Sequence, residues 1–393
     1  PMSNTWVEAN ITNVVEEIKN GNAAILIDQV SDFILADTTG GVHRLIADPV
    51  NESAIVGSRE GFVENIETNI SILRRRIKDK NLVVENVRLG KRSQTQAAIL
   101  YIDDIANKDI VTEFRRRINA VDVDVINATQ SMMQHIEDYP FTIFPQYYAT
   151  ERADVVESNL MEGRIALLIN GTPAAATVPT VFIEFFQGVE DYLHRTIISS
   201  FSRLIRLLAV FVVTTFPAIY ITLIKYNVEL IPISFIIPIA SSRTGISLTP
   251  FMEVLGMSII VELLREGGLR LPVKIASTLS LVGGIIIGEM VVKSKTVSPT
   301  TLLVVGITAV SSFAIPHYTM ALVIRLISFP MLVLANLMGI FGIAAGWFFL
   351  LVHITALDSF GVPYFSLTKS SLKDFVIRAP LWQMNTRPED IAM

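Results

Sequence analysis

Acidic side chains interrupt the apolar second half of the chain, between residues 201 and 356. Glu289 is the deepest acid of this region, and Glu262 shares a helical face with Ser258. A carboxylate that faces lipid costs several kcal/mol, so such acids are expected to face water, a cation or a counter-charge. These residue types can attract and hold cations.

A set of hydroxyl side chains lies on the segment from residue 300 to 315, which Pro299 and Pro316 flank. Hydroxyls on one side of a helix can replace part of an ion's hydration shell, although many simply bond to carbonyls one turn earlier. Acids and hydroxyls together give these candidates for the lining of an ion path: Ser258, Glu262, Glu289, Thr301, Thr308, Ser311 and Ser312.

Pairing within one chain is the alternative explanation of the acids. Glu262 can pair with Arg265 on an interfacial helix, and Glu289 with Lys293 one turn later. Glu253 projects from the opposite side of the helix that carries Glu262, so it is not placed on the path.

Small residues recur in the next apolar segment, from 275 to 292. Their spacing predicts one helical face that another helix can approach closely, and packing is preferred here to a channel. The packing candidates are Ser280, Gly284 and Gly288, preceded by Ser277.

Long apolar runs must position these side chains in a membrane. Between Arg206 and Lys225 about eighteen residues carry no acid or base, which is enough to cross a hydrocarbon core. Further spans are predicted at 231–264 in a broken form, 275–292, 300–316 and 319–356. The last run is too long for one straight span, so Pro330 or the glycines at 339, 342 and 346 must break it.

The first part of the chain has charge clusters, short β-branched runs and turn signals typical of a soluble unit. Strands are predicted within 22–38 and at 82–89, 97–103 and 122–127, and helices at 58–80, 108–120 and 129–138. The predicted fold class is an α/β cytosolic domain followed by an all-α, multi-span transmembrane domain. The domains are 1–145 (α/β), 146–203 (a coupling segment with a membrane-surface helix over 182–206), 204–356 (transmembrane) and 357–393 (a cytosolic tail).

Composition excludes several function classes for these 393 residues. A net charge of −5 without a basic stripe argues against nucleic acid. Zero cysteines exclude thiol chemistry and thiolate metal sites, and phosphate-loop, metalloprotease and nucleophile-elbow motifs are absent from the sequence. Neither an enzyme nor a metal or cofactor site is predicted. The first residues lack the pattern of a secretory signal, so the soluble part is expected to stay in the cytosol.

Several separated segments carry a family resemblance: GSREGFVENIETNISILRRRI, FPQYYATERADVVESNLMEGRIALLINGTP, LLREGGLRLP, SSFAIPHY and SFGVPY. In this order they resemble the A subunit of spore germination receptors, the GerABKA family. The resemblance implies a protein of the inner spore membrane that works with a transporter-like B subunit and a lipoprotein C subunit. It also implies a homo-oligomer, expected to be a pentamer, around a path for monovalent cations. The stage V sporulation paralogues, which amplify ion flux, and a non-conducting signalling scaffold stay open as alternatives.

Charged and amide residues within the shared motifs are the candidates for subunit contact: Arg59, Glu60, Asn69, Glu151, Arg152, Asn159, Glu162 and Arg164. Two features depart from the family's pattern. Relatives commonly have Glu at the position of Ser258 and Gln near Glu289, which leaves ion selectivity open. The family also carries a further soluble subdomain ahead of residue 1, which this chain is expected to lack.

Overall fold

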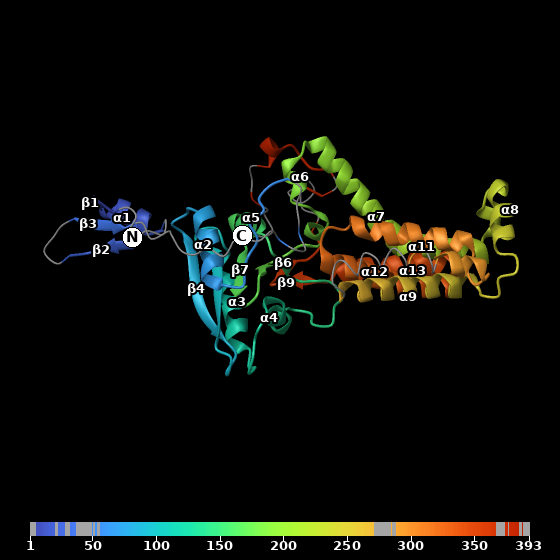
Figure 1. The fold of residues 1–393 in the computed structure, drawn as a ribbon, viewed down its shortest axis with the longest axis horizontal. Helices are drawn as coiled ribbons and strands as arrows, with labels where there is room; N and C mark the ends of the chain where they lie inside the picture. The colour runs from blue at the N-terminus through green and yellow to red at the C-terminus, as the bar shows by residue number, and fades with distance from the viewer. Residues whose placement is uncertain are drawn as a thin grey trace. The chain divides into compact units, whose positions relative to one another are not determined.

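The computed structural model describes residues 5–19, 23–27, 32–36, 49, 52, 56–270, 284, 288–366, 374–375, 377–384 and 387. The chain divides into two compact units (Figure 1). Unit 1 comprises Pro1–Glu184, Val189–Ser199 and Ala356–Met393, and unit 2 comprises Phe185–Gly188 and Ser200–Thr355. Along the chain, unit 2 is therefore inserted into unit 1.

A small antiparallel sheet begins unit 1. Its strands follow the order β1-β3-β2, and one helix, α1, lies between β1 and β2 in the sequence. The bounds are β1 Thr5–Glu8, α1 Ile11–Lys19, β2 Ala23–Ile25 and β3 Phe33–Ala36. The two strands predicted within 22–38 are confirmed as β2 and β3.

A five-stranded sheet with the order β4-β5-β7-β8-β6 forms the centre of unit 1. Every neighbouring pair is antiparallel, and the longest pairing, between β4 and β5, runs from Leu82 opposite Ile102 to Leu89 opposite Thr95. The strands are β4 Leu82–Leu89, β5 Thr95–Ile102, β6 Tyr148–Thr150, β7 Ile165–Ile169 and β8 Ala175–Val178.

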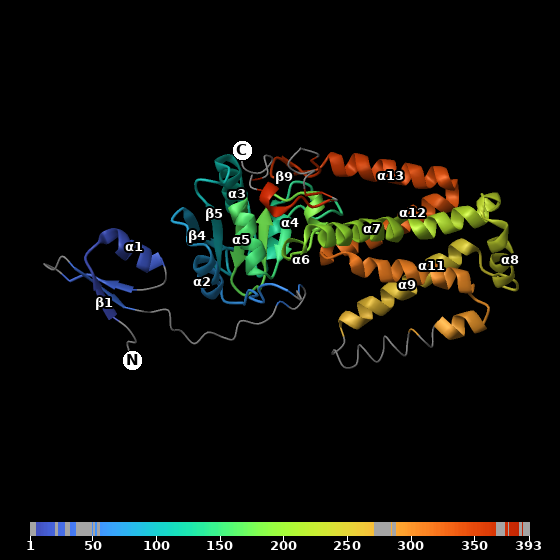
Figure 2. The ribbon, with the colours of Figure 1, turned by 90° about the horizontal axis from the view of Figure 1, so that it is seen from above.

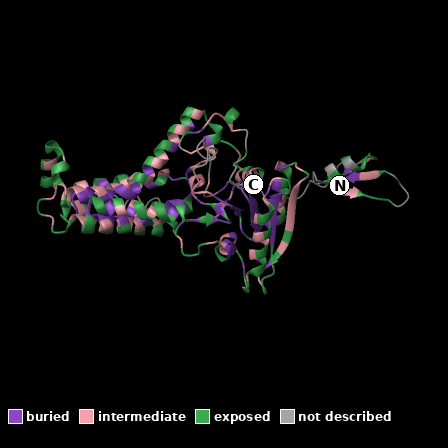
Figure 3. Ribbon diagram, turned by 180° about the vertical axis from the view of Figure 1, so that it is seen from behind, coloured by how far each residue is buried: buried purple, intermediate pink, exposed green. Residues whose placement is uncertain are grey.

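Helices cover both faces of this sheet, so its central strands are buried on both sides (Figure 3). In β5, Ile99 and Tyr101 belong to the core beside α3 (Lys108–Ala120) and α4 (Thr129–Ile136). Successive strand residues point to opposite faces. The intervening Ala98, Leu100 and Ile102 therefore join the second core, beside α2 (Ile66–Arg76) and α5 (Ala153–Met161).

Two local predictions in unit 1 need correction. The helix predicted from residue 58 begins at Ile66, because the side chain of Asn65 caps it by accepting a 3.0 Å hydrogen bond from the Thr68 backbone. The segment 122–127, predicted as a strand, is irregular. Its carbonyls instead accept hydrogen bonds from the β4–β5 turn, as Val123 does from the Lys91 nitrogen at 2.9 Å.

Apolar helices make up unit 2 (Figure 2). α7 has 30 residues and contains an 18-residue window with a mean hydropathy of 2.3, and α12 has 21 residues and such a window with a mean hydropathy of 2.0. Among the described residues these two are long and apolar enough to cross a membrane, and α8, α11 with η3, and α13 are shorter apolar helices. The bounds are α7 Thr196–Lys225, η2 Val228–Leu230, α8 Ile233–Ser242, α9 Pro250–Leu269, α11 Pro299–Ser311, η3 Ser312–Ala314, α12 Tyr318–Met338 and α13 Ile340–Thr355.

The predicted breaks in the apolar runs fall at turns. Residues 231–264 divide into α8 and α9, and the long run from 319 divides at Gly339, whose φ of 59° suits glycine. Pro330 stays inside α12. Most of the span predicted at 275–292, including Ser280, lies outside the described residues.

The membrane-surface helix predicted over 182–206 is wrong as a single element. The chain forms the short helices η1 (Phe182–Phe186) and α6 (Glu190–Leu193), and α7 then begins at Thr196. The backbone of His194 is extended between α6 and α7, which ends the first helix before the second begins.

After unit 2 the chain returns to unit 1 as a short hairpin of β9 (Asp358–Ser359) and β10 (Val362–Pro363). At its turn the ring of Phe360 lies 5.5 Å from that of Phe114, inside the core beside α3. The Ser359 hydroxyl donates to the carbonyl of Gln146 at 2.8 Å. These contacts make the hairpin part of the folded unit.

Candidate functional site

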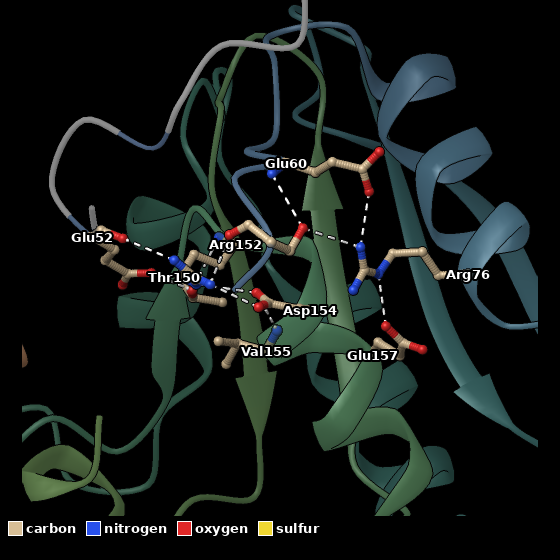
Figure 4. A network of polar contacts seen from close by, with 9 residues as sticks. Glu52, Glu60, Arg76, Thr150, Arg152, Asp154, Val155 and Glu157 are labelled. Atoms are coloured by element: carbon tan, nitrogen blue, oxygen red, sulfur yellow. Dashed lines mark hydrogen bonds and ion pairs between the residues drawn. The ribbon is translucent and has the colours of Figure 1, made fainter. Parts of the chain in front are cut away.

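Arg152 is the centre of a polar network in unit 1 (Figure 4). Its side chain is only 3% exposed, and its guanidinium lies 2.7 Å from Asp154. It also donates to the backbone carbonyls of Glu52 (3.2 Å) and Ser58 (2.9 Å). These carbonyls are far from Arg152 in sequence, so one buried cation joins both Glu52 and Ser58 to the start of α5.

Glu52 is a second acid beside Arg152, and its side chain accepts a 2.5 Å hydrogen bond from the Thr150 hydroxyl. Burial raises the pKa of Glu52 from 4.5 to about 7, against the hydrogen bond from Thr150, and the charge of Glu151 adds to the rise. The protonation of this carboxyl therefore changes near neutral pH.

A second part of the network joins α2 to α5 through Arg76. Its guanidinium donates to Glu60 at 2.8 Å and to Glu157 at 2.6 Å (Figure 4). Glu60 also pairs with the more exposed Arg75. The two acids outweigh the cost of partial burial and raise the pKa of Arg76. Arg75 and Arg76 at the end of α2 thus make contacts within the chain.

Arg164 forms another buried ion pair in unit 1. Its side chain is 4% exposed and pairs with Glu184 and, at 2.9 Å, with Glu162. Burial opposes its charge, but the carboxylates of Glu184 and Glu162 outweigh that effect and raise the pKa of the guanidinium. The Thr180 hydroxyl completes the cluster by donating to Glu184 at 2.9 Å.

Most of the residues predicted as subunit contacts are thus bonded inside their own chain. Asn69 is fully buried. Its side-chain oxygen accepts from the Val63 nitrogen at 2.8 Å, and its side-chain nitrogen donates to the Val63 carbonyl at 2.6 Å. Asn159 donates to the Thr177 hydroxyl at 2.8 Å. Arg59 is exposed, and the carbonyl of Glu151 accepts from the Phe62 nitrogen at 2.8 Å. The contact role stays a prediction.

In unit 2 the buried acid is Glu253, which the helical-face argument had set aside. It is 0% exposed and lies 2.8 Å from the guanidinium of Arg243. Its second oxygen accepts from the Ser298 nitrogen at 2.8 Å and from the Thr301 hydroxyl at 3.0 Å. Thr301, predicted to line a path, is therefore buried against Glu253 and also bonds to Tyr220 at 3.0 Å.

Glu262 lies in a second cluster, which we call the Glu262 cluster: Glu262, Arg265, Ser312 and Arg325. One carboxylate oxygen is 3.3 Å from Arg265 and the other 3.2 Å from Arg325 of α12. Arg265 also donates to the Ser312 hydroxyl at 2.6 Å. Two arginines share one carboxylate, so the cluster has surplus positive charge. The Glu262 side chain remains 38% exposed.

The other predicted lining residues do not join these clusters. Ser258 and Ser311 are half-buried on α9 and α11, and the Thr308 hydroxyl donates to the carbonyl of Val304 at 2.8 Å. Glu289 is exposed and pairs with Lys293 at 2.5 Å, the alternative foreseen for it. Of the packing candidates, Gly284 is exposed and Gly288 half-buried.

Sequence reasoning missed one cation at each acid, Arg243 beside Glu253 and Arg325 beside Glu262. Arg325 stands inside an otherwise apolar helix, and a charge in such a place is itself a signal of function or of a buried partner. Arg243 stands in the turn between α8 and α9, where an exposed basic residue is ordinary, so no sequence signal marked it.

The chain joins an α/β unit to a unit of apolar helices with charged residues bonded across them, and two of the described helices are long and apolar enough to cross a membrane. A family model described as Bacillus/Clostridium GerA spore germination protein matches residues 1–390. The chain belongs to this GerA family of spore germination proteins.

Named relatives agree with the family. Spore germination protein KA of Bacillus subtilis (strain 168) is 37% identical over 396 residues, which cover 100% of this chain and 73% of that protein. Spore germination protein B1 of the same organism is 36% identical (97% and 80% covered), and spore germination protein GerLA of Bacillus cereus is 34% identical (96% and 77%). The crystal structure of the N-terminal domain of the A subunit of the Bacillus megaterium spore germinant receptor GerK3 aligns with a TM-score of 0.35 and 32% identity, covering 47% of this chain and 66% of that one.

Proposed function

We propose that this chain is the A subunit of a spore germination receptor and that several copies bring their helical units together in the inner spore membrane. In this assembly the helices enclose a nutrient-gated path for monovalent cations, and the α/β unit lies in the cytosol. A transporter-like B subunit and a lipoprotein C subunit are the proposed partners. Family membership and the two apolar helices of membrane-spanning length support this proposal.

The observation that carries the ion path is the partly exposed carboxylate of Glu262 in α9, among the helices of unit 2. An acid at membrane depth usually serves a pathway or a partner charge. Here Arg265 and Arg325 hold both oxygens, so the acid is unavailable to a cation in this arrangement. Opening would then require Arg325, which comes from a different helix, to move away from Glu262.

Potassium flux from liposomes that contain the purified full chain tests this proposal. Arg325→Gln removes one of the two cations that pair with Glu262 and should raise potassium flux at least severalfold. In the double variant that also carries Glu262→Gln, this rise should be absent. Glu266→Gln is the matched control, because Glu266 is an exposed acid of the same helix that pairs with Arg270 at 2.6 Å. Absence of flux from every oligomeric fraction would defeat the conduction proposal.

A non-conducting signalling scaffold is the second candidate function. Its support is that the hydroxyls of Thr301, Thr308 and Ser312 are bonded within the chain. A scaffold predicts that Glu262→Gln leaves flux unchanged and alters only the assembly of the receptor. Size-exclusion chromatography on the same preparations distinguishes the two outcomes.

A further inference from the structure

The Glu262 cluster carries one positive charge more than its single carboxylate can neutralise. Arg265 and Arg325 come from different helices, and their side chains are 18% and 15% exposed. A guanidinium that is largely removed from water and shares its counter-charge with a second cation is costly, so such a place attracts an anion. The carboxylate side of the cluster, at Glu262, is the more exposed side.

The bonds within the cluster leave hydrogen-bond donors unused. Within the described part of the chain, the guanidinium of Arg325 bonds only to Glu262, through Nε and Nη2 at 3.2 Å each, so Nη1 has no acceptor. Arg265 reaches the same carboxylate at 3.3 Å. Strong bonds between a guanidinium and a carboxylate are roughly 2.7–2.9 Å long, so Glu262 uses the full capacity of neither arginine. The 2.6 Å bond from Arg265 to the Ser312 hydroxyl keeps the first guanidinium in place.

The cluster lies near one end of its helices. Arg265 stands about one turn before α9 ends at Leu269, and Arg325 about two turns after α12 begins at Tyr318. At 1.5 Å per residue, both arginines are within roughly 10 Å of a helix end. The ring of Tyr318 is exposed, and exposed tyrosines at the ends of apolar helices mark the membrane–water interface. In a membrane, the cluster is therefore at the level of the lipid headgroups.

We propose that the phosphate of an anionic lipid binds between Arg265 and Arg325. This inference rests on the proposed function for the placement of unit 2 in a membrane, but not for conduction. Phosphate oxygens accept from a guanidinium as carboxylates do, and basic pockets between membrane helices bind anionic headgroups. The phosphate supplies the missing negative charge, bonds to Nη1 of Arg325 and competes with Glu262 for that arginine. Lipid binding thus weakens the contact between α9 and α12 that opening must break.

Native mass spectrometry of the full chain in detergent measures this binding. Dioleoyl-phosphatidylglycerol should occupy a first, saturable site at least tenfold more tightly than dioleoyl-phosphatidylcholine, whose choline offsets the charge of its phosphate. Arg325→Gln should weaken the binding of phosphatidylglycerol at least tenfold. Arg270→Gln is the matched control, because Arg270 is a 77% exposed arginine at the same end of α9, and it should leave the affinity unchanged.

Glu262→Gln distinguishes a lost site from a damaged fold. It removes the competing carboxylate and should tighten the binding of phosphatidylglycerol severalfold, which misfolding cannot do. Equal affinity for the two lipids, or an affinity that neither Arg325→Gln nor Glu262→Gln changes, would overturn the proposal. Displacement of the lipid by equimolar inorganic phosphate would assign the cluster to a soluble anion and overturn it as well. Lipid binding that follows these expectations without potassium flux would support this site and defeat conduction alone.

Discussion

The carboxylate of Glu253 lies 2.8 Å from the backbone nitrogen of Ser298, the residue that caps α11. Glu253 also stands in the first turn of its own helix, α9. One negative charge therefore meets the positive ends of two helix dipoles, and Arg243 supplies the neutralising cation. The start of α11 is fixed to the start of α9 by this acid.

Glu253→Gln should destabilise unit 2. The change removes the charge that pairs with Arg243 and leaves a half-buried guanidinium without compensation, a loss of about 3–5 kcal/mol in comparable buried pairs. Thermal unfolding of the full chain in nanodiscs, followed by circular dichroism, measures the effect. Glu266→Gln breaks an exposed pair on the same helix and should change the melting temperature little. Equal shifts for both variants would contradict the assignment.

The acidity of Glu52 should make the stability of unit 1 depend on pH. Its pKa is about 7 in the folded chain, above the ordinary 4.5 expected after unfolding. The folded state therefore binds the extra proton between these values, and stability falls as pH rises from 4.5 to 7, then levels off. In Glu52→Gln this loss, up to about 3 kcal/mol, should disappear. Urea unfolding of both proteins across this window measures it, and parallel curves would exclude the effect.

Arg152→Met should loosen the segment before α2. The side chain volume is largely kept, but the bonds to the Glu52 and Ser58 carbonyls and to Asp154 are lost. Hydrogen exchange should speed up at residues 58–63, including the Phe62 amide, which now bonds to the carbonyl of Glu151.

Arg75→Met is the control for this experiment, because Arg75 is 57% exposed and pairs with Glu60 at the surface. It should leave exchange in 58–63 almost unchanged. If the two variants exchange alike, Arg152 does not hold the segment.

Two glycines of unit 2 should respond oppositely to alanine. At Gly342 an added Cβ would lie 2.1 Å from the carbonyl oxygen of Leu334, so Gly342→Ala must shift the turn between α12 and α13 and should cost about 1–3 kcal/mol. At Gly256, inside α9, it would meet nothing within 4 Å. Gly256→Ala should therefore stabilise the helix by up to about 1 kcal/mol. Melting temperatures of the two variants on either side of the wild-type value would confirm the contrast.

Local periodicity was enough to predict much of unit 1. The apolar run at 97–102 indicated a strand, and it is buried on both faces of the sheet. The boundary of α2 was missed because capping by Asn65 outweighed the helical spacing that starts at Phe62. The segment 122–127 alternates like a strand, but no neighbouring strand edge pairs with it in the described sheet.

The candidate site was predictable only in part, because a sequence defines the faces of a helix and not the neighbours of each face. The pairing of Glu262 with Arg265 follows from their spacing in one helix. The second ion pair of Glu262, with Arg325, depends on where α12 lies and cannot be read from the sequence. Glu253 was set aside because it points away from Glu262. That side of α9 is the one that contacts α11, so the neglected acid is the buried one.

Phe360 completes the core of unit 1 but follows all of unit 2 along the chain. During synthesis Phe114 cannot contact Phe360 until the ribosome has translated α13. The apolar helices of unit 2 are therefore translated before the core of unit 1 can close. A chain released early, anywhere between residues 200 and 355, would leave that core open, and cellular quality control could recognise it by the exposed aromatic surface.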